Sequence, residues 1–406
     1  MDVRKIREDF PILQTEVHGR PLIYLDNAAT LQMPEPVLET VTAHYRTCNA
    51  NVHRGVHSLS QKSTDHLEKA RQNVAEFLSA DPREIIFTAG TTDSLNQLSR
   101  MLAGRVLPGQ QIIVSAMEHH SNLIPWQELA RTKGAKLSIL PMDEQGDLDL
   151  EALQTQLKTD TALVAVTWCS NVLGTVNPIG EIAMLCHEAG ALCIVDGAQS
   201  MKLRPVDVKR LDCDFLAFSG HKLGALTGAG VLYGKRALLE RLPPASFGGG
   251  MVGTVSYDFS TYGALPQRFE AGTPNYVGAI SLGAAIDYLR GVGLPDIAVR
   301  EERLTAQLAE QLSEIPVLHI LGSPRRRSGA VSFYAEGIHP FDLGAMLDSL
   351  GIAVRTGHMC AQPLVESFGV DSVVRISPAF YNTEEEITGC AEAIKKVLPM
   401  LRRDRS

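Results

Sequence analysis

The sequence predicts an α/β fold with a large, mostly parallel β-sheet and a second, smaller domain. Short apolar runs rich in β-branched residues alternate with helical patterns, which is typical of βαβ units around a parallel sheet. The 406 residues are also enough for two or three domain-sized units and a cleft between them. Ligands of such sheets bind beyond the carboxyl ends of the strands, so the residues that follow each strand are the candidates for function.

The expected strands and helices divide the chain into three parts. Strands are predicted over residues 84–88, 111–115, 136–140, 162–168 and 191–196, with helices over 95–102, 123–133 and 179–189. Helical and strand patterns resume at 301–312, 330–333 and 384–401. We therefore expect an N-terminal segment (1–25) that packs with the small domain, a large domain (26–290) and a small α/β C-terminal domain (291–406).

Segment 248–274 differs from the rest, with four glycines in its first six residues and Tyr, Phe and Thr after them. It is too long for a simple connection between two elements. We expect an ordered hairpin or a functional loop there.

Composition excludes several classes of protein. A net charge of −8 gives no basic surface for nucleic acid. The seven cysteines contain no CxxC pair, which argues against a disulfide framework and a structural zinc site and favours a reducing cytoplasm. The N-terminus has no apolar signal region and no run of 18 apolar residues occurs, so we expect neither secretion nor a membrane span. No metal site is predicted.

Lys222 follows an apolar run, residues 215–218, and precedes a glycine-rich turn. A lysine that forms a Schiff base needs a site that disfavours its ammonium and holds its stem, which the end of a buried strand supplies. Asp196 ends another expected strand and could reach the ring nitrogen of pyridoxal 5′-phosphate (PLP), while Gln199 could bind the phenolic oxygen of its ring. Taken alone, each of these residues is equally typical of an ordinary strand end.

Three further strand ends carry polar groups. Thr91 and Thr92 follow a glycine between a strand and a helix, where backbone N–H groups and hydroxyls would face an anion. His119 follows the strand at 111–115 and could stack on a flat cofactor. It is a poor metal ligand, because the adjacent His120 points to another side and no HExxH motif is present. Asn171 follows the strand at 162–168 and so lies at the same edge of the sheet.

Cys360 stands in a polar turn near Arg355 and His358, and cationic neighbours favour a reactive thiolate. The other cysteines lie mostly in strand or helix patterns that are typical of buried, inert thiols. Arg375, on a short strand pattern, could clamp a substrate carboxylate through two parallel hydrogen bonds. His53 and Arg54 form a second basic cluster.

Nearly end to end, the chain resembles the group II (SufS/CsdA-like) cysteine desulfurases, which are fold-type I PLP enzymes of aminotransferase class V. The resemblance rests on ordered motifs at 24–30 (YLDNAAT), 53–57 (HRGVH), 90–92 (GTT), 118–122 (EHHSN), 170–175 (SNVLGT), 195–199 (VDGAQ), 219–222 (SGHK), 268–274 (RFEAGTP), 360–363 (CAQP) and 381–383 (YNT). The short loop around Cys360 is similar to group II rather than to the longer-looped IscS/NifS group.

The resemblance implies a role for each candidate. Lys222 would hold PLP covalently, His119 would stack on the ring, and Asp196 and Gln199 would bind its nitrogen and phenolic oxygen. The phosphate would be held by Thr91, Thr92, Ser219 and His221, with Thr273 reaching in from the other subunit of a homodimer. Arg375, Asn171 and Arg54, with His53 and Arg355 nearby, would bind the substrate. Cys360 would take sulfur from L-cysteine and pass the persulfide to a SufE- or SufU-like acceptor for Fe–S cluster assembly in the cytoplasm.

The chain departs from the family pattern at four places: Met359, Gly224–Leu226, Lys202–Leu203 and Met251 stand where the family usually has other residues. These positions leave the expected cofactor residues intact but touch the Cys360 loop and the acceptor-facing surface. Two alternatives therefore stay open. One is a selenocysteine lyase, or another class V lyase or epimerase, and the other is a non-catalytic scaffold.

Overall fold

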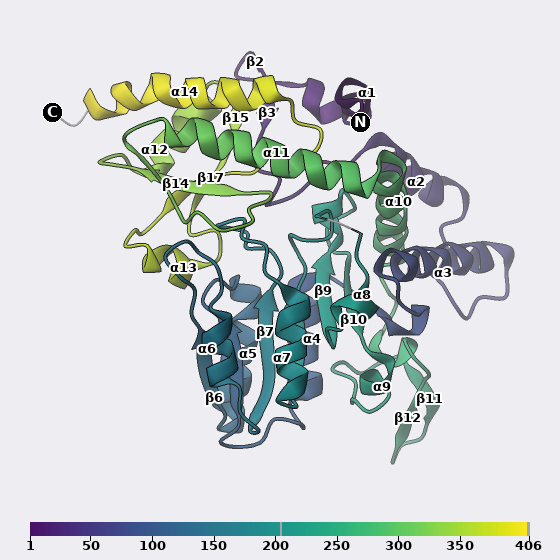
Figure 1. The fold of residues 1–406 in the computed structure, drawn as a ribbon. Coiled ribbons are helices and arrows are strands. Elements are labelled where there is room, and N and C mark those ends of the chain that lie inside the picture. Colours follow the sequence, from purple (N-terminus) through teal and green to yellow (C-terminus); the bar gives the residue numbers. More distant parts are fainter. Residues whose placement is uncertain (204, 404–406) are drawn as a thin grey trace.

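The structure is a computed structural model that describes residues 1–203 and 205–403. Its centre is a seven-stranded sheet with helices around it, and a second group of helices and strands lies above the sheet (Figure 1). The sheet order is β4 (Ile85–Thr88), β10 (Gly230–Gly234), β9 (Phe215–Ser219), β8 (Leu192–Asp196), β7 (Thr161–Thr167), β5 (Gln111–Ser115) and β6 (Lys136–Leu140). In this sheet β10 runs antiparallel to both its neighbours and the other pairings are parallel. The predicted fold class is confirmed.

The inner strands of the large sheet, β5, β7, β8, β9 and β10, are buried on both faces, because helices cover both. Along β5 and β7, Ile113 and Val164 belong to one buried cluster, whereas Ile112 and Leu163 belong to another. The helices of this part of the chain are α2 (Glu35–Thr47), α3 (Ser58–Leu78), α4 (Thr91–Leu102), α5 (Ile124–Lys133), α6 (Leu150–Gln156), α7 (Ile179–Glu188), α8 (Val208–Leu211), α9 (Arg236–Leu239) and α10 (Tyr276–Val292), with short 3-10 turns η2 (Pro82–Glu84), η3 (His120–Asn122), η4 (Gly220–Leu223) and η5 (Gln267–Phe269).

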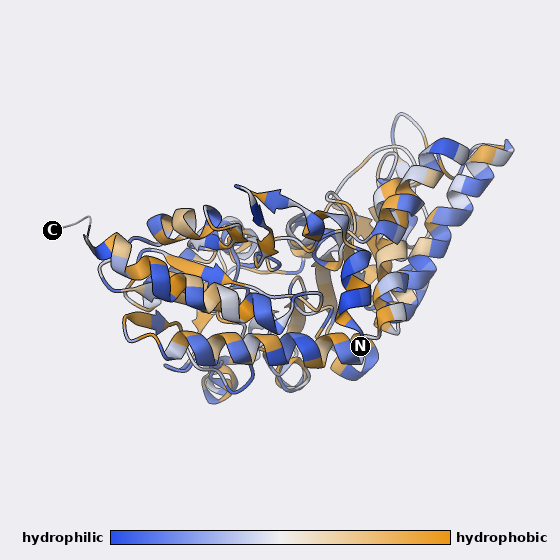
Figure 2. Ribbon diagram, turned by 90° about the horizontal axis from the view of Figure 1, so that it is seen from above, coloured by the Kyte–Doolittle hydropathy of each residue, from blue (hydrophilic) through white to orange (hydrophobic). Residues whose placement is uncertain are grey.

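Helices α2, α3 and α10 pack together at the side of the large domain (Figure 1). Each carries both hydrophilic and hydrophobic residues, as the mixed colours of this bundle in Figure 2 show, so that one face is available for packing. Segment 248–274 contains the hairpin of β11 (Val252–Val255) and β12 (Ser260–Tyr262), which projects from the body of the molecule. Of the two expectations for this segment, the ordered hairpin is the one observed.

The C-terminal part has its own antiparallel sheet, in the order β13 (Leu318–Ile320), β14 (Val331–Ala335), β17 (Val373–Ile376) and β16 (Arg355–Gly357). A separate buried cluster packs this sheet against helices α11 (Leu294–Ser313), α12 (Pro340–Asp348) and α14 (Glu384–Arg403). Helix α13 (Gln362–Ser367) follows the Cys360 loop.

The N-terminal segment contacts this C-terminal part. It contains α1 (Val3–Glu8), η1 (Pro11–Gln14), β1 (Glu16–Val17), β2 (Arg20–Pro21) and β3 (Ile23–Tyr24). Strand β3 pairs in parallel with β15 (Ile352–Ala353), and Arg7 forms an ion pair with Glu386 at 2.8 Å. The domain boundaries stay a prediction, and residues 404–406 of the expected small domain lie outside the described residues.

In the described part of the chain, no single helix is long and apolar enough to cross a membrane. Helices α10 and α11 pass a test of length and composition only when taken together, and they are bent by 79° at their junction.

Candidate active site

A cavity of about 290 Å³ lies where the large sheet meets the C-terminal part. The predicted site residues that line it come from both: Thr91, Thr92, His119, Asn171, Asp196, Gln199, Ser219, His221, Lys222, Arg355, Cys360 and Arg375. Among the predicted residues, His53, Arg54 and Thr273 do not line this cavity, and Thr273 lines a different one. Most of the expected site is therefore assembled within one chain, and the roles of the other three residues stay predictions.

Lys222 and Asp196 reach the cavity from neighbouring parallel strands. Lys222 lies on η4, directly after β9, and Asp196 is the last residue of β8. Desolvation lowers the pKa of Lys222 to about 8, although the carboxylate of Asp196 opposes this shift. The neutral amine, which is the nucleophilic form, is thus accessible near neutral pH. Asp196 is itself buried, which raises its pKa, while Lys222 and a 2.9 Å hydrogen bond from the backbone N–H of Ala198 favour its carboxylate.

The first turn of α4 forms the polar end of the cavity. The backbone N–H of Thr91 donates to Ser219 Oγ at 2.8 Å, and the two hydroxyls are also 2.8 Å apart. The hydroxyl of Thr92 contacts that of Ser121 at 2.6 Å. A Cβ added to Gly230 would lie 2.3 Å from the Cα of Gly90, so β10 approaches this turn closely only because residue 230 is glycine. Hydroxyls and a helix N-terminus together suit an anionic group such as phosphate.

His119 is a neutral ring at neutral pH. Desolvation, with the charge of Lys222 as the next cause, lowers its pKa to about 4, and its Nδ1 accepts from the backbone N–H of Ser121 at 3.1 Å. A neutral imidazole is suited to stacking against a flat ring.

The neighbouring Glu118 holds this strand end in place, a role that the sequence motif did not reveal. Its carboxyl oxygens accept from Ser115 Oγ (2.5 Å), Asn122 Nδ2 (2.6 Å) and the backbone N–H of Thr167 (2.8 Å). Complete burial raises its pKa to about 8.

Arg375 is buried on β17 and is held on two sides. Its Nη1 donates to the backbone oxygen of Asn171 and its Nη2 to Asp26 Oδ1, both at 3.0 Å. The other oxygen of Asp26 pairs with Arg355 at 2.6 Å. Sequence reasoning missed Asp26, since its arginine partners lie more than 300 positions away. The bonds to Asn171 and Asp26 use two of the five N–H donors of the guanidinium, and Arg375 lines the cavity, so donors remain for a ligand.

The Cys360 loop has a strained backbone, and Cys360 itself is exposed between the buried Met359 and Ala361. Met359 and Cys360 both have positive φ, at 54° and 53°. The backbone oxygen of Cys360 accepts from the N–H of His120 at 2.7 Å, and that of Met359 accepts from Asn171 Nδ2 at 2.7 Å. The amide donor of Asn171, which the sequence assigned to substrate, is therefore engaged in holding this loop. The thiol of Cys360 is exposed and lines the cavity.

Comparison with known proteins identifies the family to which this chain belongs. The aminotransferase class-V profile matches residues 23–389. The chain belongs to the aminotransferase class-V family. A probable cysteine desulfurase of Halalkalibacterium halodurans is 46% identical over 398 residues, covering 98% of each chain. Two solved structures are similar: an apo cysteine desulfurase from Thermococcus onnurineus NA1 (TM-score 0.94, 39% identity, 98% of each chain) and the cysteine desulfurase CsdA from Escherichia coli (0.92, 37%, 99% of each).

These relatives agree with the group II resemblance seen in the sequence. They also account for the cofactor, because class-V aminotransferases and cysteine desulfurases are PLP enzymes. The cavity fits PLP on its own evidence: an amine with a lowered pKa, a buried carboxylate on the next strand and a polar helix N-terminus converge in it.

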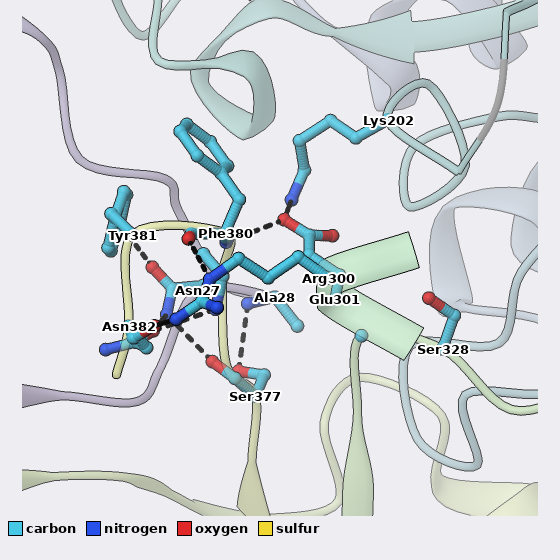
Figure 3. Close-up of polar contacts among 12 residues, drawn as sticks. Asn27, Ala28, Lys202, Arg300, Glu301, Ser328, Ser377, Phe380, Tyr381 and Asn382 are labelled. Carbon is cyan, nitrogen blue, oxygen red and sulfur yellow. Dashed lines mark hydrogen bonds and ion pairs between the residues drawn. The ribbon is translucent and has the colours of Figure 1, made fainter. Parts of the chain in front are cut away.

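The departures from the family pattern have structural explanations at two positions. Lys202 forms a buried ion pair with Glu301 of α11 at 2.7 Å, and Glu301 also accepts from the backbone N–H of Phe380 (Figure 3). Lys202 therefore links the segment that follows β8 to helix α11 of the C-terminal part. Met359 is buried and packs in the main core, with its backbone oxygen bound by Asn171. Nothing in the structure explains the substitutions at Gly224–Leu226 and Met251 in terms of sulfur transfer.

Beside this ion pair, a second polar network joins the two parts of the molecule. Asn27 donates to the backbone oxygen of Ser377 at 2.8 Å and contacts both Tyr381 and Asn382 (Figure 3). Asn27 directly follows Asp26, and Ser377 lies two residues after Arg375. The network therefore fixes the segments that carry the arginine and its carboxylate partner.

Proposed function

We infer that the chain is a PLP-dependent cysteine desulfurase that converts L-cysteine to L-alanine and keeps the sulfur as a persulfide on Cys360. The observation that carries this function is that Lys222, Arg375 and the exposed thiol of Cys360 line one cavity. The full-length relatives named cysteine desulfurase support the same reaction.

The residues that would hold PLP are those at the strand ends. Lys222 would bind its aldehyde, Asp196 the ring nitrogen, Gln199 the phenolic oxygen and His119 a face of the ring. Thr91, Thr92, Ser219 and His221 would hold the phosphate. When bound, PLP supplies an electron sink that stabilises negative charge on the substrate's α-carbon.

Three side chains of the protein then bind the substrate, transfer its proton and accept its sulfur. The guanidinium of Arg375 donates to the substrate carboxylate, which orients L-cysteine toward Lys222. The neutral amine of Lys222 takes and returns the proton at the α-carbon. The Cys360 thiolate attacks the substrate sulfur: an S–S bond forms, the substrate's C–S bond breaks, and its electron pair goes to the β-carbon, which is protonated to give alanine. One cysteine and one thiol thus yield one alanine and one persulfide.

The onward path of the sulfur is part of the same proposal. An exposed persulfide on Cys360 is suited to a SufE- or SufU-like protein acceptor, and hence to Fe–S cluster assembly. Selenocysteine is the alternative substrate that the sequence analysis left open. A selenocysteine lyase as the main activity is not favoured, because a thiol lies in the cavity and the relatives are cysteine desulfurases.

We also propose a homodimer in the cytoplasm. Support for the dimer is that Thr273, with His53 and Arg54, lies outside the chain's own cavity, so that a second subunit would complete the site. Support for a reducing compartment is that all seven cysteines are free.

The test is to incubate the PLP-loaded protein with L-cysteine and a reductant and to measure alanine and sulfide. Wild type forms both in equal amounts, and Cys360→Ala forms neither. Cys390→Ala, which removes a thiol buried in the C-terminal core, is the matched control and retains activity. Unchanged sulfide release by Cys360→Ala would reassign the nucleophile. Turnover of selenocysteine but not of cysteine by the wild type would overturn the desulfurase assignment.

A further inference from the structure

Two imidazoles and a thiol meet between α2 and α3, apart from the cavity described above. His44 lies in the last turn of α2, Cys48 ends that helix one turn later, and His66 faces them from α3. The Nδ1 atoms of the two histidines are 3.3 Å apart, and Cys48 Sγ lies 3.5 Å from His44 Nδ1 and 3.7 Å from His66 Nδ1. Three ligating atoms thus form a nearly equilateral triangle.

The size of this triangle matches a tetrahedral zinc site. With Zn–N bonds of about 2.0–2.1 Å and a Zn–S bond of about 2.3 Å, tetrahedral angles place two nitrogens about 3.3 Å apart and a nitrogen and sulfur about 3.5 Å apart. All three observed separations lie within about 0.2 Å of these values.

Hydrogen bonding alone does not satisfy the three contacts. In a neutral imidazole, Nδ1 either donates or accepts, and the thiol has one proton to donate. In any combination of tautomers, at most two of the three contacts can be hydrogen bonds, because each hydrogen bond needs a proton on one atom and a free lone pair on the other. Nδ1 is also the only nitrogen of the His44 ring with a polar neighbour, because Nε2 is buried without a hydrogen-bond partner among the described residues. A cation at the centre of the triangle engages all three lone pairs at once.

The exposure of the three residues and the chemistry of their nitrogen and sulfur atoms favour zinc over other ions. His44 and Cys48 are 2% and 4% exposed, whereas His66 is exposed, so an ion has a path from solvent and room for a water ligand. Two imidazoles and a thiolate suit zinc and disfavour magnesium and calcium, which prefer oxygen.

We propose that His44, Cys48 and His66 bind one zinc ion, with water as the fourth ligand, and that this ion fastens α2 to α3. This proposal differs from the sequence analysis, which predicted no metal site, because the ligands stand on two helices without a recognised spacing. The ion would lie at the base of loop 49–57, which α3 already holds. Ser60 Oγ donates to the backbone oxygen of Asn51 at 2.7 Å, and the backbone N–H of His53 donates to Thr64 Oγ1 at 2.8 Å. This inference does not depend on the proposed reaction.

The experiment uses the full-length, PLP-loaded protein carrying Cys360→Ser, which removes the exposed thiol as a competing ligand. After chelation and dialysis, zinc is titrated against a chromophoric chelator, and cobalt is added separately to detect a thiolate-to-cobalt absorption band. We expect one zinc per chain and a cobalt band. Both His66→Ala and Cys48→Ser weaken zinc binding by about 100-fold or more and abolish the band, since loss of a direct ligand exceeds the 10–100-fold typical of outer-sphere changes.

His18→Ala is the matched control, because His18 is also an exposed histidine and lies in the N-terminal segment; it leaves zinc binding unchanged. His66 is exposed, so its replacement tests the site without disturbing a core, and circular dichroism checks the fold of each variant. Zinc binding that is equal in the parent, His66→Ala and Cys48→Ser, or no zinc binding by the parent, overturns the proposal.

Discussion

The two reacting groups of this protein stand in opposite structural settings. Lys222 emerges from the central sheet, where the flanking strands β8 and β9 are buried on both faces and the lysine's pKa is lowered by desolvation. Cys360 is an exposed residue in a turn with two successive positive φ angles, and hydrogen bonds from His120 and Asn171 hold this turn. The lysine needs a desolvated site to be neutral, whereas the cysteine must be reachable by both the substrate and an acceptor protein. The difference predicts that perturbing the two sites produces separable defects.

The largest effect is expected from Lys222→Ala, which removes both the attachment of the cofactor and the proton-transfer base. Alanine formation from cysteine falls by about 10³-fold or more, since proton transfer alone contributes 10²–10⁴-fold. The absorption band of the lysine-bound cofactor disappears as well. Normal turnover by this variant, measured as alanine per chain, contradicts the assignment of Lys222.

Cys360→Ala tests whether the two sites are separable, because it removes the exposed thiol and leaves Lys222 in place. We expect a loss of alanine formation of about 10²-fold or more while the cofactor band stays as in wild type, since no strand end is touched. Absorbance spectra and single-turnover alanine assays on the same sample separate the two. A variant that also loses its cofactor would show that the loop and the strand ends are not independent.

The lowered pKa of Lys222 also predicts how cofactor capture depends on pH. Because the pKa of Lys222 is lowered to about 8, its neutral fraction, and with it the rate of cofactor capture by the cofactor-free protein, rises about tenfold between pH 7 and pH 9 and then levels off. Stopped-flow absorbance at each pH gives this rate. A rate that still climbs above pH 10 would mean that the amine has the pKa of an ordinary exposed lysine.

The smallest effect is expected from Asn171→Asp, which keeps the size of the side chain but removes the donor to Met359. Loss of this buried hydrogen bond loosens the Cys360 loop and lowers the rate of alanine formation by about 5- to 30-fold, with cofactor binding unchanged. Faster alkylation of Cys360 by a small haloacetamide reports the loosened loop. An unaltered alkylation rate together with a raised KM for cysteine would return Asn171 to the carboxylate-binding role that the sequence suggested.

The same contrast explains what the sequence could predict. Strand ends are local features, so Lys222, Asp196 and His119 were located from apolar runs and their polar termini, and the parallel sheet brought them together. The contacts of the loop are not local: Asn171 and Met359 lie 188 positions apart, and Asp26 and Arg375 lie 349 apart. No periodicity encodes such pairs. The sequence does not predict the triangle of His44, Cys48 and His66 for the same reason, since His66 approaches the other two residues only after α2 and α3 have both packed on α10.

The most direct test of the central claim is to mix the PLP-loaded protein with one equivalent of L-cysteine without reductant and to analyse its peptides by mass spectrometry. The account predicts a mass increase of one sulfur atom on the peptide that contains Cys360, together with one alanine per chain. Alanine that forms while the added sulfur is absent from Cys360, or is found on another cysteine, would contradict it.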